Sequence, residues 1–377
     1  MKYRGIGALA LAAVLGACAG AAPARADAGE PGAGPAGSGQ AGDPERVYVT
    51  GQDDATVTVI DAATHQVLEV VDLQAMGYSA NAKPHHIVVD PDGAHWYVSL
   101  IGENRVLKLD TANRVVGEAA FEVPGMLVYD HASDWLYVGR SMSAVNPPRR
   151  IGIIDRSTME TVEELEVLYP RPHPLAAHPT AGLVYSSSLA ANQMAVVDPA
   201  EQDVRVLPLT GGEEAATPGQ PEDGMVHTMV QFAVSPDGRS MVGTGEMSGR
   251  LLVYDLADPA SPVLVEDLGV GSRPWHPAYS PDGTEVWVPN KGSNSITVVE
   301  TDGWTVVEEI QSDGLSEPHG LAFSADGRWA FVSSNDLAGA IPGDGGAVAV
   351  IDAETREVVK VIPVGPNATG IGTNARP

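Results

Sequence analysis

Six of the ten histidines of this chain occupy one recurring position, the start of a short apolar run that ends at a turn. They are His85, His86, His173, His227, His276 and His319. Imidazole is the commonest metal ligand in proteins and also transfers protons near neutral pH. If the repeated segments are arranged around an axis, these rings converge at one mouth of the molecule. We therefore predict that the six histidines form a metal-binding site.

The residues around His227 indicate which metal. Met225, His227 and Met229 alternate along the chain, so on a strand all three side chains point to one face. Thioether beside imidazole favours copper, and Cu(I) in particular. Copper is therefore the predicted cofactor. The alternative is that both methionines pack in the core.

Four charged residues in predicted loops could assist such a site. Lys291 and Glu246 are the candidate catalytic residues, Lys291 as a charge stabiliser or proton donor and Glu246 as a base. Arg140 and Arg149, the candidate cofactor-binding residues, flank the predicted loop at 141–148 and could clamp an anion. Each of the four could instead be a solvated side chain.

The candidate residues can come together only if a repeated structural unit positions them. A β-rich run ends at an acidic residue seven times, at intervals of 43 to 57 residues: Asp61, Asp110, Asp155, Asp198, Asp255, Glu300 and Asp352. This interval is close to the length of a four-stranded propeller blade. Between the acids lies a hairpin turn that ends at Gly93, Gly182, Gly238, Gly283 or Gly327. The pattern predicts an all-β fold, a seven-bladed β-propeller.

The first repeat begins at its second strand, Arg46–Thr50, and has no innermost strand of its own. Residues Pro366–Gly372 have the sequence of that missing strand. We therefore predict that the C-terminal strand completes the first blade and closes the ring, which removes exposed sheet edges. The long connections are predicted to lie on the histidine face: 74–83, 141–148, 210–224 and 335–345.

The N-terminal residues are predicted to be a targeting segment. Lys2 and Arg4 precede an apolar run, Ile6–Leu15, which is too short to span a bilayer. The following residues, Leu15 to Cys18, resemble a bacterial lipobox, which implies lipidation of Cys18. The alternative is ordinary signal cleavage after Ala26.

The predicted organisation is thus a signal peptide with lipobox at 1–18, a flexible Ala/Gly/Pro tether at 19–44, and the propeller at 45–377. Cys18 is the only cysteine, so the chain has no intramolecular disulfide. The predicted location is the periplasm, with membrane contact only through the lipid anchor.

The net charge excludes one class of partner. The chain carries 22 Lys and Arg against 49 Asp and Glu, a net charge of −27. Such a surface repels phosphate backbones, so nucleic-acid binding is not expected. Acidic residues at 213–214 and 222–223 could form a rim that binds a periplasmic protein partner.

Three motifs resemble the YVTN family of seven-bladed propellers. They are Tyr48–Gly51, Val57–Asp61 and the strand start Pro318–Gly320, and the resemblance extends from Arg46 to Pro377. It implies the propeller fold and does not imply an activity.

Two further resemblances concern cofactors. His85-His86 and Pro318–Gly320 are similar to the channel histidines around the copper cluster in the propeller of nitrous oxide reductase. Pro172–Pro174 is similar to a strand start in the haem d1 propeller of cytochrome cd1 nitrite reductase. The first resemblance implies copper, and the second implies haem d1 as an alternative. The chain lacks the cysteine-bearing copper domain and the cytochrome c domain of these enzymes.

The function predicted from sequence is that of an exported propeller with a histidine-lined axial metal site that serves redox chemistry or metal handling. One alternative is a propeller that binds a protein partner without catalysis. Another is a metal-free hydrolase, because related propellers include lactonases. The sequence has no G-x-S-x-G nucleophile motif. Whether the protein is an enzyme, and whether its ligand is a metal or a small molecule, stay open at this point.

Overall fold

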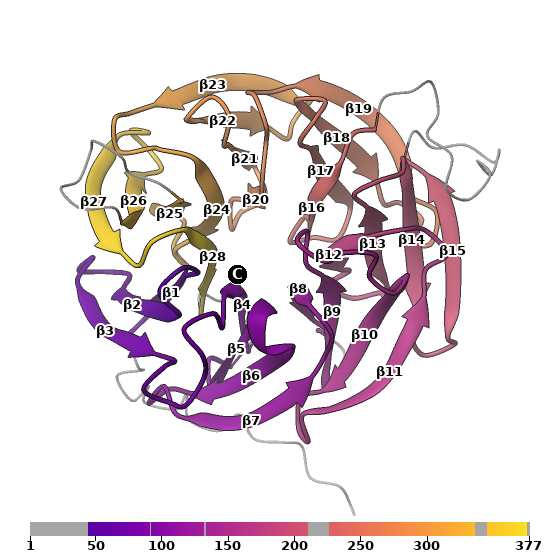
Figure 1. The fold of residues 1–377 in the computed structure, drawn as a ribbon. Helices are drawn as coiled ribbons and strands as arrows, with labels where there is room; N and C mark the ends of the chain where they lie inside the picture. The colour runs from indigo at the N-terminus through magenta and orange to yellow at the C-terminus, as the bar shows by residue number, and fades with distance from the viewer. Residues whose placement is uncertain (1–43, 91, 132, 210–225, 336–344, 375–377) are drawn as a thin grey trace, which may run out of the picture. The chain divides into compact units, whose positions relative to one another are not determined.

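The structure, a computed structural model, describes residues 44–90, 92–131, 133–209, 226–335 and 345–374. Within these residues 28 strands form seven antiparallel sheets of four strands each. The sheets are arranged as blades around a central axis (Figure 1). The predicted seven-bladed β-propeller is therefore confirmed.

The innermost strands of the blades, from the first blade to the seventh, are β28 (Ala368–Thr373), β4 (Pro84–Val89), β8 (Pro124–Tyr129), β12 (Pro172–Ala177), β16 (Met229–Val234), β20 (Ala278–Tyr279) and β24 (Pro318–Phe323). The second strands are β1 (Arg46–Gly51), β5 (His95–Leu100), β9 (Trp135–Arg140), β13 (Val184–Ser188), β17 (Ser240–Gly245), β21 (Glu285–Asn290) and β25 (Trp329–Ser334). A short 3-10 helix, Ile101–Glu103, follows β5.

The third strands are β2 (Thr56–Asp61), β6 (Arg105–Asp110), β10 (Arg150–Asp155), β14 (Gln193–Asp198), β18 (Arg250–Asp255), β22 (Ser295–Glu300) and β26 (Gly346–Asp352). The outermost strands are β3 (Val67–Asp72), β7 (Val115–Ala120), β11 (Glu160–Glu166), β15 (Asp203–Pro208), β19 (Val263–Gly269), β23 (Thr305–Gln311) and β27 (Val358–Val364).

The ring closes through the first blade, as predicted. The C-terminal strand β28 pairs with β1, and Val49 lies opposite Ile371. Side chains strengthen this closure, since the Thr50 and Thr369 hydroxyls are 2.9 Å apart and the Gly370 N–H donates to the Thr50 hydroxyl at 2.8 Å. The innermost strand of blade one therefore comes from the opposite end of the described chain.

The recurring aspartate has a structural role where the third strand ends. The Asp155 carboxylate accepts backbone N–H groups of Ser157 and Thr158, and Asp61 and Asp352 accept the matching pairs two and three residues on. The hydrogen bond from the Ser157 hydroxyl lowers the pKa of Asp155. The acid thus fixes the turn that leads to the outermost strand, which explains why the residue marks the repeat.

The glycines of the other predicted turn are equally explained. Gly93, Gly238, Gly283 and Gly327 all have φ between 71° and 73°, and Gly182 has φ 66°. This left-handed backbone is open to glycine at little cost. Each glycine turns the chain from the innermost strand into the second strand of its blade.

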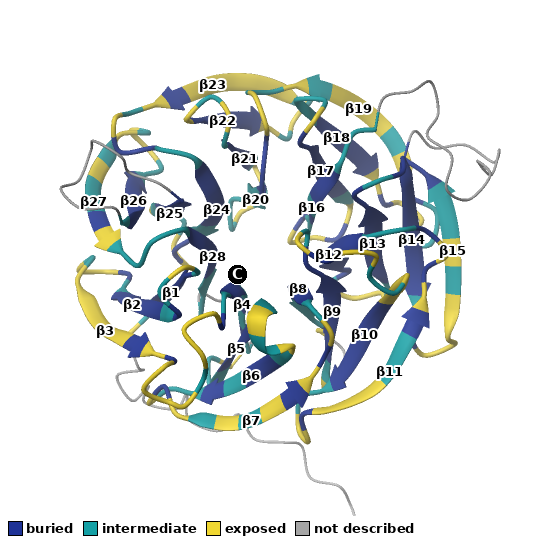
Figure 2. Cartoon of the chain, viewed as in Figure 1, coloured by how far each residue is buried: buried dark blue, intermediate teal, exposed yellow. Residues whose placement is uncertain are grey.

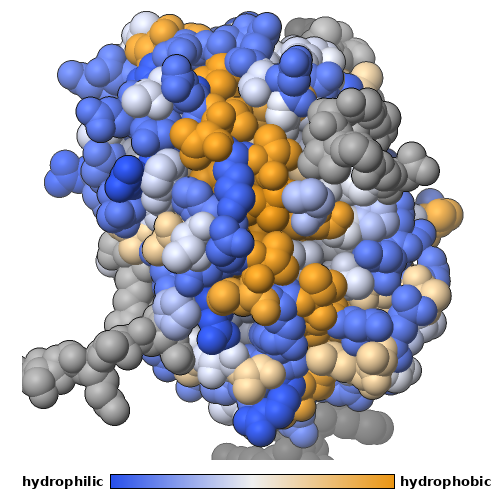
Figure 3. All heavy atoms as spheres, turned by 90° about the vertical axis from the view of Figure 1, so that its left-hand side faces the viewer, coloured by the Kyte–Doolittle hydropathy of each residue, from blue (hydrophilic) through white to orange (hydrophobic). Residues whose placement is uncertain are grey.

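Burial follows the order of the strands within a blade. The second and third strands are buried on both faces, whereas the outermost strands are largely exposed (Figure 2). Figure 3 shows the side of the molecule on which β27 and β3 lie. Apolar side chains form a band on this side. Val67, Leu68 and Val70 of β3 and Val359 of β27 are exposed by 42 to 54%. The core therefore lies between the blades, and the rim is partly apolar.

Several predictions lie outside the described residues. These are the signal segment with Cys18, the tether apart from Pro44, and the acidic residues at 213–214 and 222–223. The compact unit begins at Pro44, next to the predicted boundary. Among the described residues no helix has the length and apolar character needed to cross a membrane.

Candidate functional site

Five of the six predicted histidines lie together at the axis. His85 and His86 come from β4, His173 from β12 and His319 from β24, and His276 lies just before β20. The ring centroids of His85 and His173 are 6.3 Å apart, those of His85 and His319 6.2 Å, those of His276 and His319 4.6 Å, and those of His86 and His276 6.0 Å. We call these five residues the axial cluster.

A shared irregularity of the innermost strands positions these side chains. The pairing of β4 with β5 shifts register between Pro84 and Ile87. The same shift occurs after Pro172 in β12 and after Pro318 in β24. A bulge redirects the side chains of the residues that it contains. In all three strands the histidine immediately follows the proline, so the histidine lies within the bulge.

Two members of the cluster are held by oxygen acceptors. The Nδ1 atom of His173 lies 2.7 Å from the carbonyl oxygen of Arg140, and Nδ1 of His85 lies 3.2 Å from the side-chain oxygen of Gln52. Because these oxygens only accept, each Nδ1 atom carries the hydrogen and donates it. The Nε2 atoms of His85 and His173 therefore present lone pairs.

Two other members have the opposite arrangement. The backbone N–H of Leu127 donates to Nδ1 of His86 at 3.2 Å, and the indole Nε1 of Trp275 donates to Nε2 of His319 at 2.6 Å. In each of these rings the nitrogen lone pair accepts a hydrogen bond from a protein donor. In the neutral form the second nitrogen of His86 and of His319 therefore carries a hydrogen.

Several ring nitrogens of the cluster are buried without a partner. They are Nε2 of His85, His173 and His276, and Nδ1 of His319. A buried polar atom without a hydrogen bond costs about 1–3 kcal/mol. Four such atoms lie in the axial cluster.

The cluster is uncharged at neutral pH. Burial, together with the charge on neighbouring histidines, lowers the pKa of His85 and of His86 to about 3. Burial lowers the pKa of His173 to about 4. The pKa values of His276 and His319 also lie well below the usual value, again chiefly because of burial. All five rings are thus neutral at pH 7.

The sixth histidine stands apart from the others. The Nδ1 atom of His227 lies 2.9 Å from the Ser248 hydroxyl, and the side chain is only half-buried. The strand β16 begins two residues later, at Met229, whose side chain is fully buried in a core cluster with Phe232. Met225, His227 and Met229 were predicted to form a copper-binding face. This prediction is wrong for Met229, because its side chain packs in the core. Met225 lies outside the described residues.

Lys291 lies next to the axial cluster, on the loop between β21 and β22. Its Nζ atom is 3.5 Å from the Glu317 carboxylate and 5.1 Å from the centre of the Trp275 ring. Burial lowers the pKa of Lys291, and its positive charge in turn contributes to the low pKa values of His276 and His319. A cation thus borders the neutral rings.

Glu246 is paired with a residue that the sequence prediction did not include. Its carboxylate accepts two hydrogen bonds from the Arg273 guanidinium, at 2.8 and 3.0 Å, and its side chain is 10% exposed. The predicted role of Glu246 as a base therefore competes with its ion pair with Arg273.

The two predicted anion-binding arginines are engaged elsewhere. The Arg140 guanidinium is buried, donates to the Glu122 carbonyl oxygen at 2.6 Å and pairs with Glu164. The Arg149 side chain is exposed and donates to the Leu168 carbonyl oxygen at 3.3 Å. Arg140 contributes to the site through its backbone oxygen, which holds His173. The sequence gives no signal for this role.

Trp275 and Gln52 are functional neighbours that the sequence analysis missed. Trp275 stacks on His276 and hydrogen-bonds His319, and Gln52 fixes the His85 ring. Trp275 directly precedes His276 in the sequence, and this adjacency could have indicated that Trp275 lies near the cluster. Gln52 follows β1 in another blade, and nothing in the sequence relates it to His85.

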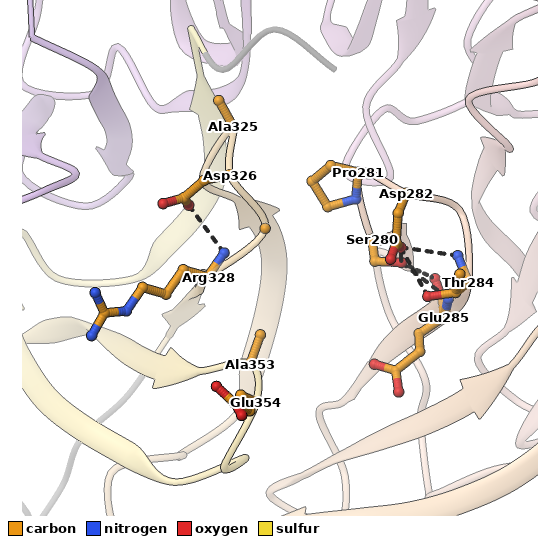
Figure 4. Close-up of a pocket in the computed structure, with 11 residues that line it drawn as sticks. Ser280, Pro281, Asp282, Thr284, Glu285, Ala325, Asp326, Arg328, Ala353 and Glu354 are labelled. Atoms are coloured by element: carbon orange, nitrogen blue, oxygen red, sulfur yellow. Dashed lines mark hydrogen bonds between the residues drawn. The ribbon is translucent and has the colours of Figure 1, made fainter.

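The described residues contain no group of three or more His, Cys, Asp or Glu side chains placed to hold a metal ion together. Within the cluster, the lone pairs of His86 and His319 already accept hydrogen bonds from Leu127 and Trp275. A surface cavity of about 560 Å³ lies elsewhere, at the turns of blades six and seven. Figure 4 shows Asp282 and Glu285 on one side of it and Asp326 and Arg328 on the other. These turns are at the opposite ends of β20 and β24 from the axial cluster.

Comparison with known proteins shows the fold. No family model matches the chain, and no curated sequence matches it. Among solved structures, Kuenenia stuttgartiensis hydrazine synthase is similar with a TM-score of 0.61 and 19% identity over 78% of this chain and 90% of that one. The dihydro-heme d1 dehydrogenase NirN in complex with DHE is similar with a TM-score of 0.58 and 16% identity over 86% and 74%.

The Pseudomonas aeruginosa periplasmic gluconolactonase PpgL is similar with a TM-score of 0.66 and 18% identity, over 88% of this chain and 99% of the gluconolactonase. At such identities a likeness concerns the fold and does not extend to activity. The chain is thus an all-β propeller of seven four-stranded blades, in which the C-terminal strand completes the first.

Proposed function

We propose that the axial cluster binds one transition-metal ion through Nε2 of His85 and Nε2 of His173. One observation carries the proposal. Both Nε2 atoms are buried, and each carries a lone pair whose direction is fixed by the hydrogen bond at Nδ1 of the same ring. Neither Nε2 atom has a partner in the described part of the protein.

The surroundings of the two rings support this proposal. Histidines that bind metals generally donate the other ring nitrogen to a carbonyl or carboxylate oxygen, which fixes the ring and makes it more basic. His173 does so through the Arg140 carbonyl, and His85 through Gln52. Because both pKa values lie far below 7, no proton needs to leave before a metal binds.

Copper is the proposed metal. Imidazole binds Zn, Cu, Fe and Ni, and copper binds most tightly among the divalent ions of the first row. The proposed role is metal handling or redox chemistry in the periplasm, by a propeller of the YVTN type. Support for export comes from the segment from Lys2 to Cys18, and PpgL, which has the same fold, is a periplasmic protein by name.

The direct test is the metal content of the protein after expression in the periplasm with copper supplied. Elemental analysis is expected to find about one copper per chain. His85→Asn and His173→Asn are each expected to lose the metal, because asparagine keeps the donor at the Nδ1 position and removes Nε2. The matched control is His131→Asn, since His131 is exposed at the far end of β8. A metal content that is equal in all four proteins would refute the site.

The residues fit a bare ion better than haem d1. Nε2 of His85 or His173 could hold a haem iron, which would supply redox chemistry. However, the side chains of Arg140 and Arg149, the residues predicted to clamp an anion, already donate to protein oxygens. A visible spectrum of the purified protein distinguishes the two cofactors.

A lactonase-like activity is a second candidate. It is favoured by the proximity of the charged Lys291 side chain to the neutral imidazoles of the cluster, which could together bind a polar substrate. The likeness to PpgL suggests gluconolactone as the first substrate to test. Hydrolysis by metal-free protein that is lost in His276→Asn but not in His131→Asn would support this candidate. No hydrolysis by the metal-free protein would exclude it.

A further inference from the structure

We infer that the axial cluster selects a monovalent ion with a filled d shell, Cu(I) in the cell, over divalent ions such as Zn²⁺ and Cu²⁺. This inference rests on the proposed metal site and adds the charge and coordination number of the ion. Two independent observations carry it, the number of available lone pairs and the charges around them.

The first observation is that the cluster offers two lone pairs that hydrogen bonds hold in place, those of His85 and His173. Nε2 of His276 also has no partner, but the described residues contain no group of three side chains placed to hold one ion. Protein Zn²⁺ sites take four ligands, and Cu²⁺ prefers a square-planar set. Monovalent copper and silver, in contrast, bind readily between only two nitrogen donors. His86 and His319 cannot become ligands without giving up the hydrogen bonds from Leu127 and Trp275.

The separation of the two rings suits such an ion. Two imidazoles on opposite sides of one ion, with each nitrogen about 2 Å from it, have ring centroids about 6 Å apart. The centroids of His85 and His173 are 6.3 Å apart. The pair could therefore hold an ion between the two rings with little movement of either strand.

The second observation is that, among the residues the structure describes, no carboxylate forms an ion pair or a hydrogen bond with a ring of the axial cluster. The cluster consists of neutral imidazoles, and its charged neighbour is Lys291. The nearby carboxylates are engaged, Glu317 with Lys291 and Glu246 with Arg273. The cost of burying an ion rises with the square of its charge, and the repulsion by Lys291 rises in proportion to it. Both effects penalise a divalent ion more than a monovalent one.

The experiment offers Ag⁺ and Zn²⁺ separately to the purified full-length protein in nitrate buffer without chloride. Silver is used because it has the charge and filled shell of Cu(I) and is not oxidised in air. After gel filtration, elemental analysis is expected to find about one Ag⁺ per chain and less than about a tenth of an equivalent of Zn²⁺. Anaerobic titration with Cu(I) is expected to give the same stoichiometry as Ag⁺.

Matched variants locate the bound ion. His85→Asn and His173→Asn retain the donor that faces Gln52 or the Arg140 carbonyl and remove only Nε2, so each is expected to weaken Ag⁺ binding at least tenfold. His86→Asn is the control within the cluster, because the asparagine oxygen can still accept the Leu127 N–H. It is expected to bind Ag⁺ as the unaltered protein does.

The outcomes separate this inference from the proposed function. Zn²⁺ binding as tight as Ag⁺ binding, and lost in His85→Asn, would overturn the selectivity and leave the metal site intact. Binding of neither ion would overturn both. Ag⁺ binding that persists in His85→Asn and His173→Asn would place the ion elsewhere and would likewise overturn both.

Discussion

The indole of Trp275 donates a hydrogen bond of 2.6 Å to Nε2 of His319. This contact occupies the lone pair of the His319 ring. The Nε2 atoms of His85 and His173 have no such donor. Trp275 therefore helps to set how many lone pairs of the axial cluster stay free.

Replacing Trp275 by Phe is expected to free Nε2 of His319. The tautomer of His319 would no longer be fixed, and a third ligand would become available. We expect the affinity for Zn²⁺ to rise at least tenfold, while the lost hydrogen bond costs about 1–3 kcal/mol of stability. Nitrogen-15 NMR of labelled histidine reports the tautomer directly. Retention of the Nδ1–H form in Trp275→Phe would contradict this view.

Protein stability is expected to fall as the pH drops below 6.5. The folded protein keeps His85, His86 and His173 neutral, with pKa values of about 3 to 4, whereas the unfolded chain protonates them near 6.5. Between these values the unfolded state binds more protons, so the free energy of unfolding decreases as the pH falls. The stability contributed by the neutral rings is fully present above pH 6.5 and is lost progressively towards pH 3.

Urea denaturation at pH 7.5, 6.0 and 5.0 measures this loss. Each pKa unit corresponds to about 1.4 kcal/mol per group at most. The double variant His85→Asn, His173→Asn isolates the contribution of the cluster from that of the carboxylates. Its stability is expected to depend less on pH over this interval than that of the unaltered protein, and an identical dependence would be the contrary result.

Lys291→Gln is expected to raise the affinity for cations. The substitution removes a positive charge beside His276 and His319 and leaves Glu317 without its partner. The gain should be larger for Zn²⁺ than for Ag⁺, because the repulsion is proportional to the charge of the bound ion. Titration calorimetry of both ions measures the difference. The control is Arg105→Gln, which removes one charge from an exposed pair with Glu118, and equal effects of the two variants would count against a local role for Lys291.

Gly370→Ala is expected to disturb both the ring closure and the site. A Cβ atom at Gly370 would lie 2.2 Å from the backbone oxygen of His85, so β28 and β4 would have to separate. Overpacking of this kind typically costs about 1–3 kcal/mol. Thermal unfolding measures the loss. The control is Gly269→Ala in β19, where the nearest atom is the end of the flexible Arg250 side chain at 3.3 Å; a similar loss there would show that the effect is not specific to the closure.

Much of the fold could be predicted because every blade repeats the same local chemistry. The acid at the end of the third strand accepts the N–H groups of the next turn, as Asp155 does, and the turn glycines adopt the left-handed backbone, as Gly283 does. Both features depend on neighbours within a few residues. They are therefore visible in the sequence as spacing.

The site was less predictable because its properties depend on contacts between blades. The sequence placed His227 with the other histidines, but β16 begins only at Met229, so the ring lies outside the bulge that positions His85, His173 and His319. The lone pairs that remain depend on Gln52, Leu127 and Trp275. No pattern along the chain reveals which nitrogen of a histidine carries its hydrogen.

The pairing of β28 with β1 also governs when the axial cluster can take its final form. The Thr369 hydroxyl donates to the His85 backbone oxygen at 3.2 Å, so the last strand braces the segment that carries two of the axial rings. A chain that is still being synthesised cannot yet make this contact. We therefore expect the five rings to reach their final arrangement only after residues 368–373 have been made and have paired with β1.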